Sequence, residues 1–182
     1  MNNVVLIGYR CTGKSTVARV LGRMLEIPVV DTDNVVQERV GKSISRIVAE
    51  EGWAFFRMHE HDVIEEVAGA RGRIIATGGG AVENTENRRL LADNNLVVWL
   101  TAERDAIVTR MIVDGKSEEE RPSLSSDPLV DEIMHILEQR TPLYREMANL
   151  IIDTTVAAAD ETAVNILEYM DKKGKKICRA IP

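Results

Sequence analysis

Short runs of aliphatic residues alternate along this chain with longer segments in which apolar positions recur every three to four residues. The aliphatic runs are unbroken, which is typical of strands buried on both faces of a parallel sheet. They predict strands at residues 4–8, 29–33, 73–77, 96–100 and 150–153. The periodic segments predict helices near residues 14–25, 33–40, 43–51, 53–69, 85–93, 103–113, 128–147 and 160–172. This order indicates an α/β fold, with a five-stranded parallel sheet between two layers of helices in a three-layer α/β/α arrangement.

The length of 182 residues suits one domain over residues 1–182. Two segments depart from the alternation of strands and helices. Residues 115–128 contain two prolines and show no apolar periodicity, which predicts a mobile loop or lid. Residues 172–182 are rich in lysine, and we expect them to form a solvated basic tail.

Charge and composition exclude several classes of protein. The formal net charge of −6 argues against a nucleic-acid-binding protein. The chain has no apolar stretch of about 18 residues and no signal-peptide pattern at its start, so we expect no membrane contact. Its two cysteines, Cys11 and Cys178, are too far apart for a zinc motif or a disulfide framework, which favours the reducing cytoplasm.

The strongest motif is a phosphate-binding loop at residues 8–15, which matches G-x-x-x-x-G-K-S/T and lies between a predicted strand and a predicted helix. In such a P-loop, backbone N–H groups at a helix N-terminus cradle phosphates. We expect Lys14 to reach the β- and γ-phosphates, and the Ser15 hydroxyl to ligate one Mg²⁺ ion. The expected phosphate contacts are Cys11, Thr12, Gly13, Lys14, Ser15 and Thr16. The motif therefore indicates a P-loop NTPase type of fold with a nucleotide site.

Two aspartates end the second predicted strand, on the edge of the sheet where α/β proteins bind ligands. We expect Asp31 to contact the metal through water and Asp33 to face a second substrate. Asp33 is also a candidate N-cap for the helix predicted to follow it, so a purely structural role stays open.

Glycines and arginines supply further candidates. Gly78-Gly79-Gly80 follows the third strand, where the backbone can approach a ligand closely or simply turn. Arg121 lies in the irregular segment, from which it could close onto transferring phosphates. Arg140 precedes Thr141-Pro142, where we expect the helix to break and to leave the arginine at a corner. Arg57 alone is an ordinary helical arginine.

Taken in order, these motifs resemble the shikimate kinase family, which belongs to the P-loop folds similar to nucleoside monophosphate kinases. The resemblance covers nearly the whole chain. It is carried by the phosphate loop, Asp31-Thr32-Asp33, Gly52 to Phe56-Arg57 with Glu60, Gly78-Gly79-Gly80, Arg121-Pro122, and Arg140-Thr141-Pro142-Leu143-Tyr144.

The resemblance implies ATP-dependent phosphorylation of the 3-hydroxyl of shikimate, with ATP and shikimate as the ligands of a monomeric enzyme. It assigns the shikimate carboxylate to Arg57 and Arg140, the hydroxyls to Asp33, and a backbone donor to Gly79. Residues about 33–62 would form the acceptor-binding helical region. The implied catalytic residues are Lys14, Asp33 and Arg121, and the implied nucleotide contacts include Arg110 and Arg121.

The chain also departs from the family pattern. Cys11 stands where the family usually has glycine, three glutamates precede Arg121, and residues 154–159 lack the arginine expected beside adenine. Two other functions stay open. Another small-metabolite kinase, such as a gluconate kinase, would share the phosphate loop but use other acceptor residues. A non-catalytic nucleotide-binding module would have no need of Lys14, Asp33 and Arg121.

Overall fold

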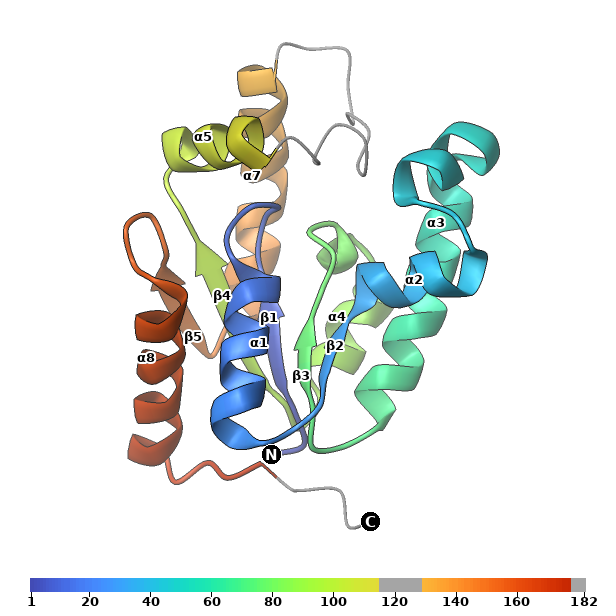
Figure 1. Ribbon diagram of the computed structural model, residues 1–182. Helices are drawn as coiled ribbons and strands as arrows, with labels where there is room; N and C mark the ends of the chain where they lie inside the picture. Colours follow the sequence, from blue (N-terminus) through green and yellow to red (C-terminus); the bar gives the residue numbers. More distant parts are fainter. Residues whose placement is uncertain (115–128, 178–182) are drawn as a thin grey trace.

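The computed structural model of the protein describes residues 1–114 and 129–177. Within them, five parallel strands form one sheet in the order β2-β3-β1-β4-β5 (Figure 1). The strands are β1 (Val4–Ile7), β2 (Val29–Asp31), β3 (Ile74–Ala76), β4 (Leu96–Thr101) and β5 (Leu150–Asp153). The predicted strands and the α/β class are therefore confirmed, although β2 ends earlier than expected.

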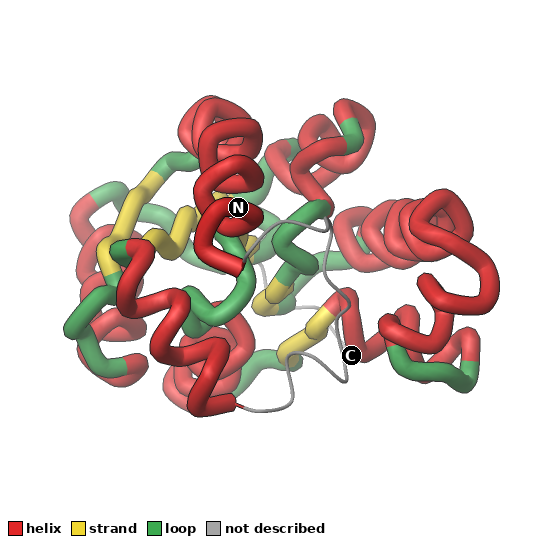
Figure 2. Tube along the Cα trace, turned by 90° about the horizontal axis from the view of Figure 1, so that it is seen from above, coloured by secondary structure: helices red, strands yellow, loops and turns green. Residues whose placement is uncertain are grey.

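Helices cover both faces of this sheet. They are α1 (Lys14–Leu25), α2 (Thr32–Val40), α3 (Ile44–Gly69), α4 (Thr85–Ala92), α5 (Arg104–Asp114), α7 (Leu129–Met147) and α8 (Ala159–Lys172). A short 3-10 helix, η1 (Ala81–Glu83), was not predicted. Helices α1 and α8 pack together on one face, and α3, α4 and α7 pack on the other (Figures 1 and 2). The three-layer arrangement is confirmed.

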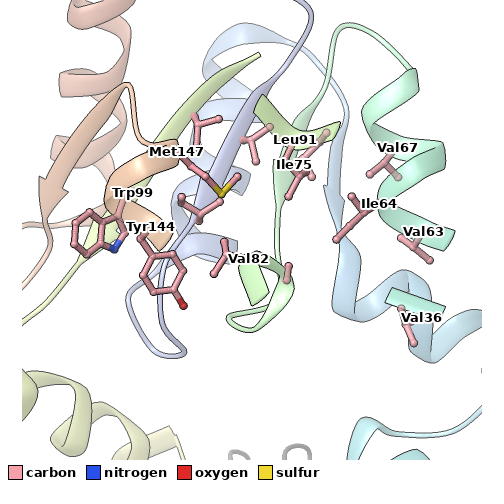
Figure 3. Packing of buried hydrophobic residues seen from close by; sticks show 14 of the residues in the cluster. Val36, Val63, Ile64, Val67, Ile75, Val82, Leu91, Trp99, Tyr144 and Met147 are labelled. Atoms are coloured by element: carbon pink, nitrogen blue, oxygen red, sulfur yellow. The ribbon is translucent and has the colours of Figure 1, made fainter. Parts of the chain in front are cut away.

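The central strand β1 connects the two layers of the core. Its residues Val5 and Ile7 face the cluster formed with α3, α4 and α7, and the alternate residues face α1 and α8. In the first cluster, Trp99 of β4 stacks on Tyr144 of α7 with ring centroids 5.7 Å apart (Figure 3). Each apolar side chain that is buried in these clusters stabilises the fold by about 1.5–3 kcal/mol relative to an exposed one. The clusters therefore hold α7 firmly against the sheet.

The junction of β2 and α2 differs from the sequence prediction. Asp31, not Asp33, is the N-cap: its Oδ1 accepts hydrogen bonds from the backbone N–H groups of Asp33 and Asn34, at 3.1 and 3.4 Å. The helix therefore begins at Thr32, before the predicted strand has ended. The alternative that Asp33 caps this helix is wrong, because Asp33 already lies in the first helical turn and its side chain is buried.

Helices α3 and α7 both continue past a residue at which the sequence predicted a break. The two predicted helices at 43–51 and 53–69 are joined as α3, and Gly52 marks their kink with φ 83° and ψ 168°. The predicted break at Pro142 was wrong, because α7 continues through the proline to Met147. A proline inside a helix costs about 3 kcal/mol, and the packing of Tyr144 and Met147 in the core offsets that cost.

Some predictions fall outside the described residues. The proposed lid at 115–128, including Arg121 and the three glutamates before it, is among them, as is the end of the basic tail at 178–182. Among the helices of the described ranges, none combines the length and the apolar character needed to cross a bilayer.

Candidate active site

The phosphate loop connects β1 to α1 with unusual backbone conformations. A Cβ atom at Gly8 would overlap the carbonyl of Leu100 on β4, and Gly13, with φ 89°, is the N-cap of α1. No described side chain caps this helix end, so the loop is suited to receive an anion there. Cys11 has φ 59°, in the left-handed region that favours glycine. The cysteine is thus accommodated, at a position whose backbone explains the glycine usual in the family.

Lys14 and Ser15 begin α1 beside the end of β2. The Lys14 side chain is buried, and its Nζ donates a 2.7 Å hydrogen bond to the carbonyl of Tyr9 within the same loop. The Ser15 hydroxyl donates to Oδ2 of Asp31 at 2.6 Å. The structure therefore brings together the two residues that the sequence predicted as the metal site, while the other oxygen of Asp31 caps α2.

A first cavity opens beside the phosphate loop. Its lining includes Cys11, Thr12, Gly13 and Thr16 from the loop and helix α1, together with Arg110 of α5. The Arg110 guanidinium donates to the backbone carbonyls of Cys11 at 3.2 Å, Thr154 at 2.5 Å and Thr155 at 3.1 Å. Arg110 thus joins the phosphate loop to the segment that follows β5 at one wall of this cavity. We call it the nucleotide cavity.

A second cavity lies on the other side of the same loop. The cavity lies between α2, α3, the turn after β3, and α7. Of the residues predicted to contact the acceptor, all four line it: Asp33, Arg57, Gly79 and Arg140. We call it the acceptor cavity.

The phosphate loop itself separates the two cavities. Its residues Tyr9 and Arg10 line the acceptor cavity, whereas the next residues, from Cys11 to Gly13, line the nucleotide cavity. A group bound on one side is therefore within one loop's thickness of a group bound on the other. This arrangement suits the direct transfer of a phosphoryl group between two bound molecules, which depends mainly on positioning and on charge.

Arg57 and Arg140 are joined through a carboxylate that sequence reasoning missed. Nη2 of Arg57 donates to Glu83 Oε2 at 3.2 Å, and Nε of Arg140 donates to Glu83 Oε1 at 3.0 Å. On its other side, Nη1 of Arg57 donates to Glu60 Oε2 at 2.6 Å. Glu83 lies in η1, whose existence the hydrophobic pattern did not indicate, so no sequence signal placed this carboxylate between the arginines.

Glu60 is an unusual component of this network because its side chain is only 1% exposed. Burial raises the pKa of its carboxyl from 4.5 to about 7, although the Arg57 guanidinium acts in the opposite direction. Asp33 lies nearby, and its negative charge raises the Glu60 pKa further. Oε1 of Glu60 has no hydrogen-bond partner among the described residues. A carboxyl in this state holds Arg57 in place and can carry a proton near neutral pH.

The three glycines after β3 let the charged side chains approach the backbone. A Cβ at Gly78 would lie 2.5 Å from Asp33 Oδ1 and 2.6 Å from Glu60 Oε1, and one at Gly80 would overlap the Arg57 guanidinium. At Gly79 the nearest atom would be 3.4 Å away, while its carbonyl accepts a hydrogen bond from Tyr144. A side chain at Gly78 or Gly80 would thus take the space of the charged groups beside it, so these two glycines do more than form a flexible turn.

Arg10 is a second residue that the sequence analysis passed over. It lines the acceptor cavity, and its Nη2 donates at 3.3 Å to Glu132 of α7, whose side chain is 2% exposed. This pair joins the phosphate loop to the helix that carries Arg140. A partner 122 positions away leaves no local signal in the sequence.

Comparisons with known proteins agree with this geometry. A family model described as shikimate kinase matches residues 10–171. The shikimate kinase of Syntrophus aciditrophicus is 43% identical over 173 residues, which cover 91% of this chain and 89% of the relative. That of Rhodopirellula baltica is 39% identical over 166 residues, with 91% and 89% covered.

Solved structures give the same result. The shikimate kinase from Acinetobacter baumannii, in complex with shikimate, has a TM-score of 0.89 and 31% identity, with 97% of this chain and 96% of that chain covered. The shikimate kinase from Aquifex aeolicus has a TM-score of 0.81 and 32% identity, with 94% and 98% covered. With the family match extending over most of its length, the chain belongs to the shikimate kinase family.

Proposed function

We propose that this protein transfers the γ-phosphoryl group of ATP to the 3-hydroxyl of shikimate, giving shikimate 3-phosphate and ADP. The observation that carries the proposal is the pair of cavities separated by one phosphate loop. The acceptor cavity is lined by three arginines, Arg10, Arg57 and Arg140, and by the buried Asp33. Such a set matches a small molecule with one carboxylate and several hydroxyls. The Acinetobacter baumannii relative, whose fold this chain shares, was solved with shikimate bound.

In the acceptor cavity, Arg57 and Arg140 would bind the shikimate carboxylate. Guanidinium groups form paired N–H···O bonds with carboxylates, which fixes the orientation of the ring. Asp33 would accept a hydrogen bond from the 3-hydroxyl and take its proton as the oxygen attacks the γ-phosphorus. The backbone N–H of Gly79 would donate to another oxygen of the acceptor. Because these contacts come from α2, α3, the glycine turn and α7 of one chain, we propose that a monomer is sufficient for activity.

In the nucleotide cavity, backbone N–H groups from Cys11 to Thr16 would bind the phosphates of ATP. Lys14 would exchange its hydrogen bond to the Tyr9 carbonyl for the β- and γ-phosphates. Its charge then stabilises the transition state, in which the bond from the γ-phosphorus to the β,γ-bridging oxygen breaks. Arg110 would lie beside the base. Arg121, assigned to the phosphates by family resemblance, lies outside the described residues and remains part of the proposal.

The residues at the end of β2 fit a Mg²⁺ ion that accompanies ATP. Mg²⁺ prefers oxygen ligands and keeps several waters, so it needs few protein groups. The Ser15 hydroxyl and the Asp31 carboxylate, 2.6 Å apart, are oxygen donors of this kind. Ser15 would ligate the ion directly and Asp31 through water. When bound, the ion neutralises charge on the phosphates, while Lys14 and the loop amides hold those phosphates in position.

The test is the release of ADP from Mg-ATP by the purified protein with shikimate, with gluconate and with no acceptor, followed by mass analysis of the product. We expect release with shikimate alone and a product heavier by one phosphoryl group. Release with gluconate in place of shikimate would assign the protein to another kinase activity. Binding of ATP without any acceptor-dependent release would overturn the proposal in favour of a non-catalytic module.

A further inference from the structure

The Glu83 carboxylate binds both Arg57 and Arg140, as the carboxylate of a ligand would. One of its oxygens accepts from Arg57 and the other from Arg140, so a single carboxylate bridges both guanidinium groups. The backbone of η1 is held in place by Arg88, whose Nη1 donates to the carbonyls of Val82 at 2.6 Å and Glu83 at 3.3 Å. Any movement of Glu83 is therefore confined mainly to its side chain.

Both arginines have surroundings other than Glu83 that restrict them. Arg57 is held by buried Glu60 and lies over the rings of Trp53 and Phe56, at 5.4 and 5.3 Å. Arg140 is only 5% exposed on α7, and its guanidinium lies against Gly79. Because an ion pair restricts Arg57 and burial restricts Arg140, we take the main effect of Glu83 to be the negative charge that it places between them.

The two carboxylates on Arg57 differ in how easily they can leave. The Glu60 side chain is 1% exposed, whereas that of Glu83 is 41% exposed. A buried carboxylate is costly to separate from its partner, but a partly exposed ion pair contributes little and can exchange for water. If the Glu83 side chain stayed in place, its negative charge would repel the carboxylate of an acceptor that binds to the same two guanidinium groups. Glu83 is thus the exchangeable member of the network.

We propose that Glu83 is a built-in competitor for the acceptor carboxylate: it occupies Arg57 and Arg140 in the empty enzyme and must swing aside when the acceptor binds. This inference rests on the proposed function, because it assumes a carboxylated acceptor between these arginines. Glu83 thereby sets the affinity for the acceptor and promotes the release of the product, which carries the same carboxylate. It is a specificity-determining residue and takes no part in the transfer of the phosphoryl group.

The test compares Glu83→Gln with the wild-type protein, using shikimate and its neutral methyl ester as acceptors. The glutamine keeps the size of the side chain and removes its charge. We expect the KM and the calorimetric Kd for shikimate to fall about threefold to tenfold, with most of the change in binding and little in kcat. The methyl ester has no carboxylate to compete with Glu83, so its KM and Kd should differ by less than about twofold between the variant and the wild-type protein.

Two further variants complete the design. Glu86→Gln removes a nearby charge that pairs with Arg89 on the surface of α4, and it should leave both acceptor constants unchanged. Glu83→Ala removes the carboxylate altogether and should also lower the KM for shikimate. A raised or unchanged KM in Glu83→Gln would overturn the inference, because it would mean that Glu83 positions the arginines or does not compete. If the wild-type protein itself neither binds nor phosphorylates shikimate, the failure lies in the proposed function instead.

Discussion

The nucleotide and acceptor cavities share one loop but are built by different means. The nucleotide cavity is lined along one side by a single continuous segment at the start of α1, whose backbone N–H groups we propose as the phosphate donors. The acceptor side uses charged side chains from α2, α3, η1 and α7, which come together only in the folded chain. Backbone recognition tolerates side-chain differences such as Cys11, whereas a network of charged side chains changes its binding properties when the charge of a member changes. The two sides should therefore respond differently to substitution.

The largest effect is expected on the nucleotide side. Lys14→Met removes the charge that would stabilise the transferring phosphoryl group while keeping a side chain of similar length. We expect kcat to fall about a thousandfold, the order found when one preorganised donor to a transition state is lost. The Kd for shikimate, measured by calorimetry without nucleotide, should change little. A comparable loss of shikimate binding would show that the two sides are not separable.

On the acceptor side, Glu60 should impose a pH dependence on stability. Its folded-state pKa of about 7 lies above the ordinary value of 4.5, so the folded state binds this proton more tightly than the unfolded state does. The resulting stabilisation is complete below about pH 4.5 and is lost as the pH rises through about 7. Between those values, the free energy of unfolding should fall by about 1.4 kcal/mol per pH unit from this group alone.

Glu60→Gln tests that contribution by replacing the titrating group with a neutral one. Urea unfolding between pH 5 and pH 8 should show a smaller decline in stability for the variant than for the wild-type protein. Glu65→Gln, at an exposed position of the same helix, is the matched control and should keep the wild-type profile. Parallel profiles for Glu60→Gln and wild type would mean that Glu60 stays ionised in the folded protein.

Arg140→Lys asks whether the acceptor side needs the shape of a guanidinium or only its charge. Lysine cannot reproduce paired N–H···O bonds, so the KM for shikimate should rise about tenfold to a hundredfold. The KM for ATP should stay within about twofold, because Arg140 lines the acceptor cavity and is not among the residues that line the nucleotide cavity. Arg145→Lys, on an exposed turn of the same helix, should leave both constants unchanged. Full activity in Arg140→Lys would argue against a planar carboxylate contact.

The smallest expected effect distinguishes two neighbouring glycines. In Gly80→Ala the new methyl group overlaps the Arg57 guanidinium, which must move at its flexible end, and we expect the KM for shikimate to rise about tenfold. In Gly79→Ala the nearest atom is 3.4 Å away, so the change should be smaller. Steady-state kinetics of both variants provides the comparison. Equal effects would indicate that the turn needs glycine for conformational freedom and not for the close approach of Arg57.

The parts of the site that could be predicted from the sequence are those with local signals. The aliphatic runs revealed the strands, and the spacing of Gly8, Gly13, Lys14 and Ser15 revealed the phosphate loop. The position of Asp31 at a strand end was enough to predict that it lies beside Ser15, because parallel strands end on the same edge of the sheet. Each of these inferences needs only a short segment and the rules of α/β topology.

What could not be predicted depends on contacts between distant segments. The Glu83 bridge requires knowing that η1 forms and which way its carboxylate points, and the Arg10–Glu132 pair spans 122 positions. Pro142 was misread because its intrinsic cost in a helix was weighed without the stacking of Tyr144 on Trp99. In the same way, Asp33 was kept open as a possible cap of α2 because sequence alone does not fix the residue at which a strand ends and a helix begins.

The most direct test of the account is a pair of calorimetric titrations of Arg57→Ala, one with shikimate and one with ATP. The account predicts that shikimate binding falls at least about a hundredfold, since a charged, bidentate contact is lost, while the Kd for ATP stays within about twofold of the wild-type value. Unchanged shikimate binding would contradict the assignment of Arg57 to the acceptor carboxylate. An equal loss of ATP binding would contradict the separation of the two cavities by the phosphate loop.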